Sequence, residues 1–150
     1  MTKITFTNGT TPALNATNLN QMQTNIENAI NALIPVQLFN NTSGTLSTIT
    51  LSETSANFTY LEIFYTRNTA DGFSSVKVYS PNGKYANLML IPAQISNDIG
   101  FYGARIYING TSITFQNGKG MTINGSGDNF FKSGYATTNE IKIFRVIGYR

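Results

Sequence analysis

Apolar and polar residues alternate with a period of two along most of the chain, which is the pattern of half-buried β-strands. Clusters of Gly, Asn, Asp and Pro separate the alternating segments, and no helical period falls between them. We therefore predict a mainly β domain over residues 35–150, an antiparallel β-sandwich with a jelly-roll-like arrangement. Its strands are expected within residues 36–41, 45–52, 57–67, 75–80, 87–95, 104–110, 112–117 and 140–149.

Residues 15–34 show the other period and predict a helix that Pro35 ends. Its apolar positions are spaced alternately three and four residues apart, which is the seam of a coiled coil. Isolated helices of this length are marginal in water, so the apolar stripe needs a partner surface. We interpret it as an oligomerisation helix; the alternative is a helix that lies on its own β domain. The predicted seam consists of Leu19, Met22, Ile26, Ala29 and Leu33, and Ile30 and Ile34 widen it toward a higher-order bundle.

The first 14 residues contain too little apolar surface to fold alone. Ile4 and Phe6 alternate with threonines before an Asn-Gly turn, and Pro12 and Leu14 follow. This pattern indicates an extended arm that pairs with another protein by strand addition, with Pro12 ending the pairing. The alternative is a frayed terminus.

Composition narrows the function classes. Asn and Thr fill 39 of the 150 positions, whereas charged residues make up 11%. The formal charge is +3, but the basic residues are scattered, so we expect no nucleic-acid partner. No apolar run approaches the roughly 18 residues of a membrane span, so we expect no membrane insertion. The chain lacks His and Cys, which excludes imidazole and thiolate metal sites and Ser-His-Asp triads.

We expect no enzyme and no cofactor. Carboxylates are the remaining acid–base groups, and glycoside hydrolysis needs two of them across a cleft. The sequence does not pair any two, although a glycan-degrading enzyme stays a third hypothesis. Glu62 lies inside an apolar strand, which predicts a cross-strand partner such as Lys77 or Lys142. Residues 58–65 and 141–149 are apolar on both faces, which hints at a subunit interface.

Aromatic residues in the stretch 117–139 suggest a ligand site. Gly and Asn punctuate this stretch, which predicts a long loop, and long loops in β domains are often functional. Aromatic rings beside amides and hydroxyls suit sugar recognition, because rings pack on CH patches and amides bind hydroxyls. Possible glycan contacts are Phe130, Phe131 and Tyr135; alternatively these rings are tucked under the loop.

The chain resembles virion fibre and tail proteins from phages of Gram-positive bacteria. The opening ITFTNGTTPALNATNLNQMQTNIENAI is similar to their N-terminal segment, an extended arm that leads into a short helix. The segment from residue 38 to 83 and the closing IKIFRVIGYR look like the β-sandwich head of the same proteins. The residues that carry the N-terminal pattern are Pro12, Leu14, Asn15, Ala16, Asn18, Leu19 and Asn20.

This resemblance implies a homotrimeric structural protein on the surface of the phage particle. The arm (1–14) would anchor to a capsid or tail protein through Ile4, Phe6, Pro12 and Leu14, the helix (15–34) would trimerise, and the head (35–150) would face outward. It does not choose between head fibre, tail fibre and receptor-binding protein. The alternative function is a receptor-recognition protein that attaches the phage to cell-wall carbohydrate of its host. With almost no shaft, the protein would be a stubby spike.

Overall fold

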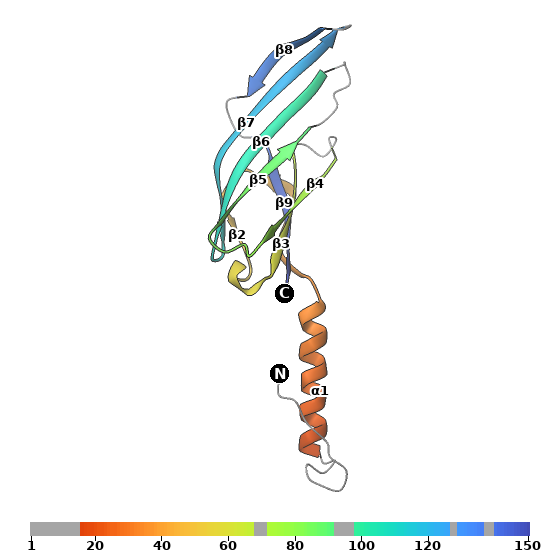
Figure 1. The fold of residues 1–150 in the computed structure, drawn as a ribbon. Coiled ribbons are helices and arrows are strands. Elements are labelled where there is room, and N and C mark those ends of the chain that lie inside the picture. The colour runs from red at the N-terminus through yellow and green to blue at the C-terminus, as the bar shows by residue number, and fades with distance from the viewer. Residues whose placement is uncertain (1–15, 68–71, 92–97, 127–128, 137–139) are drawn as a thin grey trace. The chain divides into compact units, whose positions relative to one another are not determined.

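A computed structural model describes residues 16–67, 72–91, 98–126, 129–136 and 140–150, and Figure 1 draws the remaining residues in grey. For 98–99, 121–126 and 129–136 it describes the backbone alone. The chain divides into two compact units, residues 1–35 and residues 36–150. The first contains α1 (Ala16–Leu33), so the predicted helix is confirmed. In the part of the chain that the structure describes, no helix is both long and apolar enough to cross a membrane.

The second unit is built from two antiparallel sheets, which confirms the mainly β prediction. Sheet A has the strand order β1-β9-β3-β4, and sheet B has the order β2-β7-β6-β5, with β8 also paired to β7. This two-sheet arrangement is consistent with the predicted sandwich (Figure 1). The strands are β1 (Val36–Thr45), β2 (Ile49–Thr50), β3 (Tyr60–Thr66), β4 (Ser74–Tyr79), β5 (Lys84–Leu90), β6 (Asp98–Asn109), β7 (Ser112–Ser126), β8 (Asn129–Ala136) and β9 (Lys142–Tyr149), with a short 3-10 helix at Ser55–Asn57.

The period-two pattern places one face of each sheet in a shared hydrophobic core. In β3, for example, Leu61, Ile63 and Tyr65 are buried while the residues between them are partly exposed. Burying a large aliphatic side chain contributes about 1.5–3 kcal/mol, so this core is the main source of stability. Both sheets contribute to the core: Leu38, Leu61, Ile63, Tyr65, Val78, Ile143 and Val146 come from sheet A, and Ile49, Ala86, Leu88, Leu90, Tyr102, Ala104, Ile106, Ile108 and Ile113 from sheet B.

A buried tyrosine also joins the two sheets by hydrogen bonds. The Tyr65 hydroxyl of β3 donates to the Met89 carbonyl of β5 (2.9 Å) and accepts from the Met89 amide (3.2 Å). Both backbone polar groups of Met89 thereby have hydrogen-bond partners in the opposite sheet, which fixes the relative position of the two sheets.

The prediction of a long loop over 117–139 is wrong. β6 and β7 are longer than the pattern indicates, and their ladder continues to the pair Asp98 and Asn124. β8 then pairs antiparallel with the end of β7, from Gly120 opposite Ala136 to Ser126 opposite Asn129. Gly and Asn in these segments resemble turn residues in the sequence, but here they occupy strand positions because neighbouring strands supply hydrogen-bond partners for their backbones. Figure 1 shows β6, β7 and β8 continuing beyond the end of β5.

Candidate functional site

The helix α1 leaves its apolar stripe uncovered. None of its 18 residues is buried. Ile26 is 57% exposed and Leu33 is 84% exposed, and Leu19, Met22 and Ile30 are exposed too, whereas Ala29 is half-buried. On the polar side, Gln21 donates to Asn25 (3.1 Å) and Gln23 donates to Glu27 (2.8 Å), each four residues along. Such pairs support a solvated helix face. Within the described residues of its own unit, the stripe therefore has no cover.

The outer face of sheet A carries a row of three tyrosines. Tyr60 in β3 lies opposite Tyr79 in β4 and Tyr149 in β9. The Tyr60 and Tyr149 rings are stacked with centroids 4.4 Å apart, and the Tyr79 ring lies 5.3 Å from that of Tyr60. Tyr79 is 65% exposed. The strands predicted to be apolar on both faces thus bury one face in the core and expose part of an aromatic row on the other.

Glu62 lies in the next row of this face. Its carboxylate accepts hydrogen bonds from the Ser75 hydroxyl (3.0 Å) and the Tyr149 hydroxyl (3.1 Å). Burial raises the pKa of the Tyr149 phenol, and the bond to the Glu62 carboxylate raises that pKa further. Lys77, one of the two predicted partners of Glu62, pairs with it in the strand register. The Lys77 ammonium lies over the Tyr60 ring, 5.4 Å from the ring centre.

A β-bulge at Phe144 changes which side chains of β9 face outward. Ile143 and Val146 are both completely buried in the core, although they are three residues apart. Phe144 has no partner in the register with β3, where Phe64 pairs with Arg145 and Tyr65 with Ile143. The extra residue places the consecutive Phe144 and Arg145 on the outer side of the sheet. Bulges often re-aim side chains in this way at binding sites.

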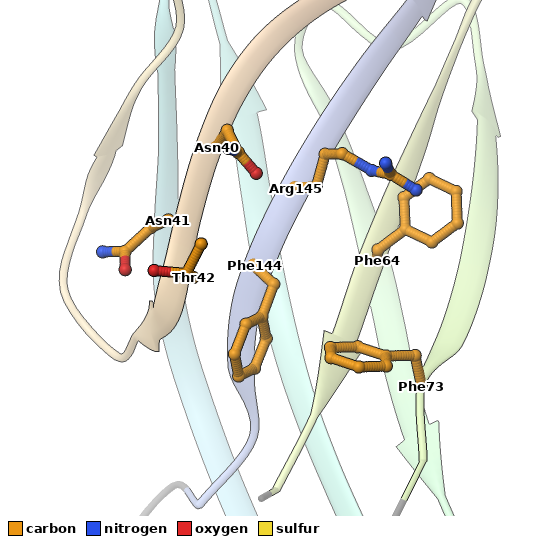
Figure 2. Close-up of a pocket in the computed structure, with 7 residues that line it drawn as sticks. All are labelled: Asn40, Asn41, Thr42, Phe64, Phe73, Phe144 and Arg145. Carbon is orange, nitrogen blue, oxygen red and sulfur yellow. The ribbon is translucent and has the colours of Figure 1, made fainter. Parts of the chain in front are cut away.

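The bulge forms one wall of a hollow of about 450 Å³ on this face. In Figure 2 the Arg145 side chain extends across Phe64, and the rings of Phe73 and Phe144 lie beside each other below it. The Arg145 guanidinium carbon is 4.5 Å from the Phe64 ring centre, and the Phe73 and Phe144 rings meet edge to face at 5.1 Å. Seven residues line the hollow: Asn40, Asn41 and Thr42 of β1, Phe64 of β3, Phe73, and Phe144 and Arg145 of β9.

Gly44 holds the Phe144 ring in this position. Its backbone has φ +67°, and a Cβ atom built on it would lie 2.6 Å from Cε2 of Phe144. The ring therefore packs directly on the glycine backbone and also contacts the Phe73 ring. Phe144 is buried but is not part of the core between the sheets.

The chemistry of the hollow suits a ligand with both apolar patches and hydroxyl groups. Phe73 is 58% exposed and offers its ring to the solvent. Asn40 and Thr42, also exposed, provide an amide and a hydroxyl, and Arg145 provides donors whose plane is fixed by Phe64. Stacking aromatic rings beside amides is the arrangement by which proteins bind sugars.

The predicted glycan contacts lie elsewhere. Phe130, Phe131 and Tyr135 belong to strand β8 instead of a loop, opposite Gly125, Asn124 and Met121 of β7. Their side chains are outside the described residues, so their role in binding stays a prediction. The predicted anchoring residues Ile4, Phe6, Pro12 and Leu14 also lie outside the described residues.

The residues of the hollow were not singled out in the sequence. Phe64 and Phe144 read as ordinary strand residues, and Phe73 as part of the turn after Gly72. The sequence contains one indication of the bulge. Ile143 and Val146 are three residues apart, so both can face the core only if the strand holds one extra residue between them. Such a break in alternation is the trace that a bulge leaves in a sequence.

In comparisons with known proteins, no protein-family model, no curated protein and no solved structure matches the chain.

Proposed function

We propose that the protein is a short homotrimeric fibre of a phage particle, with an N-terminal arm that attaches to capsid or tail, a trimerising helix and an outward β head. The observation that carries the proposal is the uncovered stripe of α1. None of the 18 residues of α1 is buried, so the described part of its own unit supplies no packing partner for the apolar face. Because most helical stability in proteins comes from packing of the apolar face, a second and third copy are the natural partners.

The sequence resemblance supplies the virion context of this proposal, and the charge-poor surface agrees with it. The arm, with Ile4, Phe6, Pro12 and Leu14, is the proposed link to the particle. Trimerisation through the seam would place three copies of the head around one axis.

The oligomeric state tests the proposal directly. Light scattering coupled to size-exclusion chromatography is expected to give three times the 16.4 kDa chain mass at micromolar protein. The reason is that trimerisation would bury Leu19, Met22, Ile26, Ala29 and Leu33 between the helices. A mass of one chain under these conditions would contradict the proposal.

A second function is favoured by the hollow on sheet A. We propose that the head recognises cell-surface carbohydrate there and thereby adsorbs the particle to its host. Phe73 would stack on a sugar ring, Asn40 and Thr42 would bind hydroxyls, and Arg145 would orient the ligand. The support for this proposal is that a bulge, a left-handed glycine and an edge-to-face ring pair all serve to hold Phe144 and Phe73 at the surface.

Phe73→Ala is expected to weaken binding to host cell-wall glycan by about five- to thirtyfold, because a lost stacking ring costs roughly 1–2 kcal/mol. Since the ring is mostly exposed, the melting temperature should change little. Binding is measured with purified cell-wall polysaccharide on a biosensor.

Tyr79→Ala is the matched control, since it removes an exposed ring from the same face outside the hollow. Its binding should equal that of the unchanged protein. Equal losses for the two variants would point to the whole aromatic face, and no loss for Phe73→Ala would reject the hollow as the site.

A further inference from the structure

We infer that the outer face of sheet B holds a second binding site, a groove for an acidic polysaccharide. The groove has a volume of about 390 Å³ and crosses β5, an edge strand of sheet B, and its neighbours β6 and β7. It lies on the opposite sheet from the hollow and shares none of its residues. The residues that define it are Asn87, Met89, Gly103, Arg105, Asn117 and Lys119.

Gly103 forms the floor of the groove, and packing within the part of the chain that the structure describes does not explain a glycine there. At Gly100, Gly120 and Gly148 a Cβ atom would lie within 2.6 Å of an aromatic ring, so packing excludes a side chain. At Gly103 the nearest atom would be the Leu88 carbonyl oxygen at 3.9 Å, an ordinary contact.

The backbone does not require the glycine either. Gly103 pairs regularly with Met89 on one side and Lys119 on the other, outside any bulge, and it is not among the positive-φ residues. A glycine in a regular strand costs stability, and such glycines often mark the close approach of another molecule. The open floor therefore points to a ligand that lies against the strand.

The walls of the groove carry positive charge. Asn87, Arg105 and Asn117 form one cross-strand row, and Met89, Gly103 and Lys119 form the next. The Arg105 guanidinium carbon lies 4.2 Å from the centre of the Tyr85 ring, which in turn packs against Tyr107 at 4.7 Å. This stacking holds the guanidinium in place before a ligand arrives. None of the described residues lining the groove is acidic.

The floor also distinguishes between classes of ligand. β6 is hydrogen-bonded to β5 and to β7 along the groove, so its backbone offers no free groups to an extended peptide. Recognition must use side chains: the cations for acidic groups, the two asparagine amides for hydroxyls, and Met89 with the flat Gly103 surface for the CH face of a sugar ring. These needs are met by a polysaccharide that bears carboxylate or sulfate groups.

A side chain placed at Gly103 tests the proposed groove most directly. Gly103→Val should weaken binding of polygalacturonate or dextran sulfate by about tenfold or more, while the melting temperature stays equal or rises because valine favours strands. The double variant Arg105→Gln/Lys119→Gln should lose at least about tenfold, since charge-assisted hydrogen bonds contribute about 1.5–3 kcal/mol each. Comparing the two polymers shows which acidic group is preferred.

Lys77→Gln on sheet A, which removes one positive charge outside the groove, is the control and should change affinity less than about twofold. Uncharged dextran should not bind detectably, and Phe73→Ala should leave binding of the acidic polymers unchanged, which separates this site from the hollow. The proposal is overturned if the unchanged protein binds neither acidic polymer, if Gly103→Val binds both as well as the unchanged protein does, or if Lys77→Gln loses as much as the double variant. Equally tight binding of poly-glutamate, also blocked by Gly103→Val, would replace the polysaccharide with an acidic peptide.

Discussion

Ile26→Asp is expected to convert the proposed trimer into monomers or to unfold the helix. Ile26 lies at the centre of the seam, so in a trimer three carboxylates would meet at the axis without partners. Burial of an unpaired charge costs several kcal/mol per chain, and mutual repulsion adds to this cost. Light scattering and the helical circular dichroism signal measure the two outcomes.

Asn28→Asp provides the control for this substitution. It adds the same charge to α1, but on the polar side, about 200° around the helix from Ile26 by helical geometry. Its mass should remain that of the unchanged protein. If Ile26→Asp also keeps that mass and merely melts at a lower temperature, the stripe covers the chain's own surface and the proposed architecture is wrong.

Gly44→Ala is expected to lower the free energy of unfolding by about 2–5 kcal/mol. Two effects combine. An alanine at φ +67° is strained by about 1–2 kcal/mol, and its Cβ would overlap the Phe144 ring and approach Cβ of Lys142 to 2.9 Å. Because the ring has to move, glycan binding at the hollow should fall as well. Chemical denaturation gives the stability, and the biosensor assay gives the binding.

Gly83→Ala separates the two effects. Gly83 has a similar φ of +73°, but no atom lies within 4 Å of an added Cβ. Its loss should be the backbone strain alone, about 1–2 kcal/mol, with binding unchanged. Equal losses at the two positions would mean that Phe144 yields without cost and that Gly44 does not hold the hollow in shape.

Elements with an uninterrupted period could be predicted from the sequence. The seam of α1 and the alternation in β3 and β4 depend only on neighbours within the same element, so the sequence alone displays their pattern. β8 was missed because Asn129–Ala136 does not alternate and contains a glycine. Its strand state comes from pairing with β7, which no local pattern encodes.

The hollow could not be predicted, for a related reason. Its walls come from β1, β3, β9 and the residue before β4, which the sheet order brings together. Phe144 adds a second difficulty, since a bulge breaks the assumption that neighbouring residues face opposite ways. Aromatic and amide chemistry of the kind predicted for Phe130, Phe131 and Tyr135 occurs on sheet A among the described residues.

The bulge also means that Phe144 behaves as a single-residue insertion in β9. Without it, Ile143 would point inward, Arg145 outward and Val146 inward, which is the order that a regular strand requires. The core would therefore keep every contact that β9 makes with it, and only the wall of the hollow would be lost. Insertion or deletion of one codon at this position would therefore create or remove the wall of the hollow. This face of the head can thus diverge between related chains while the interior stays the same.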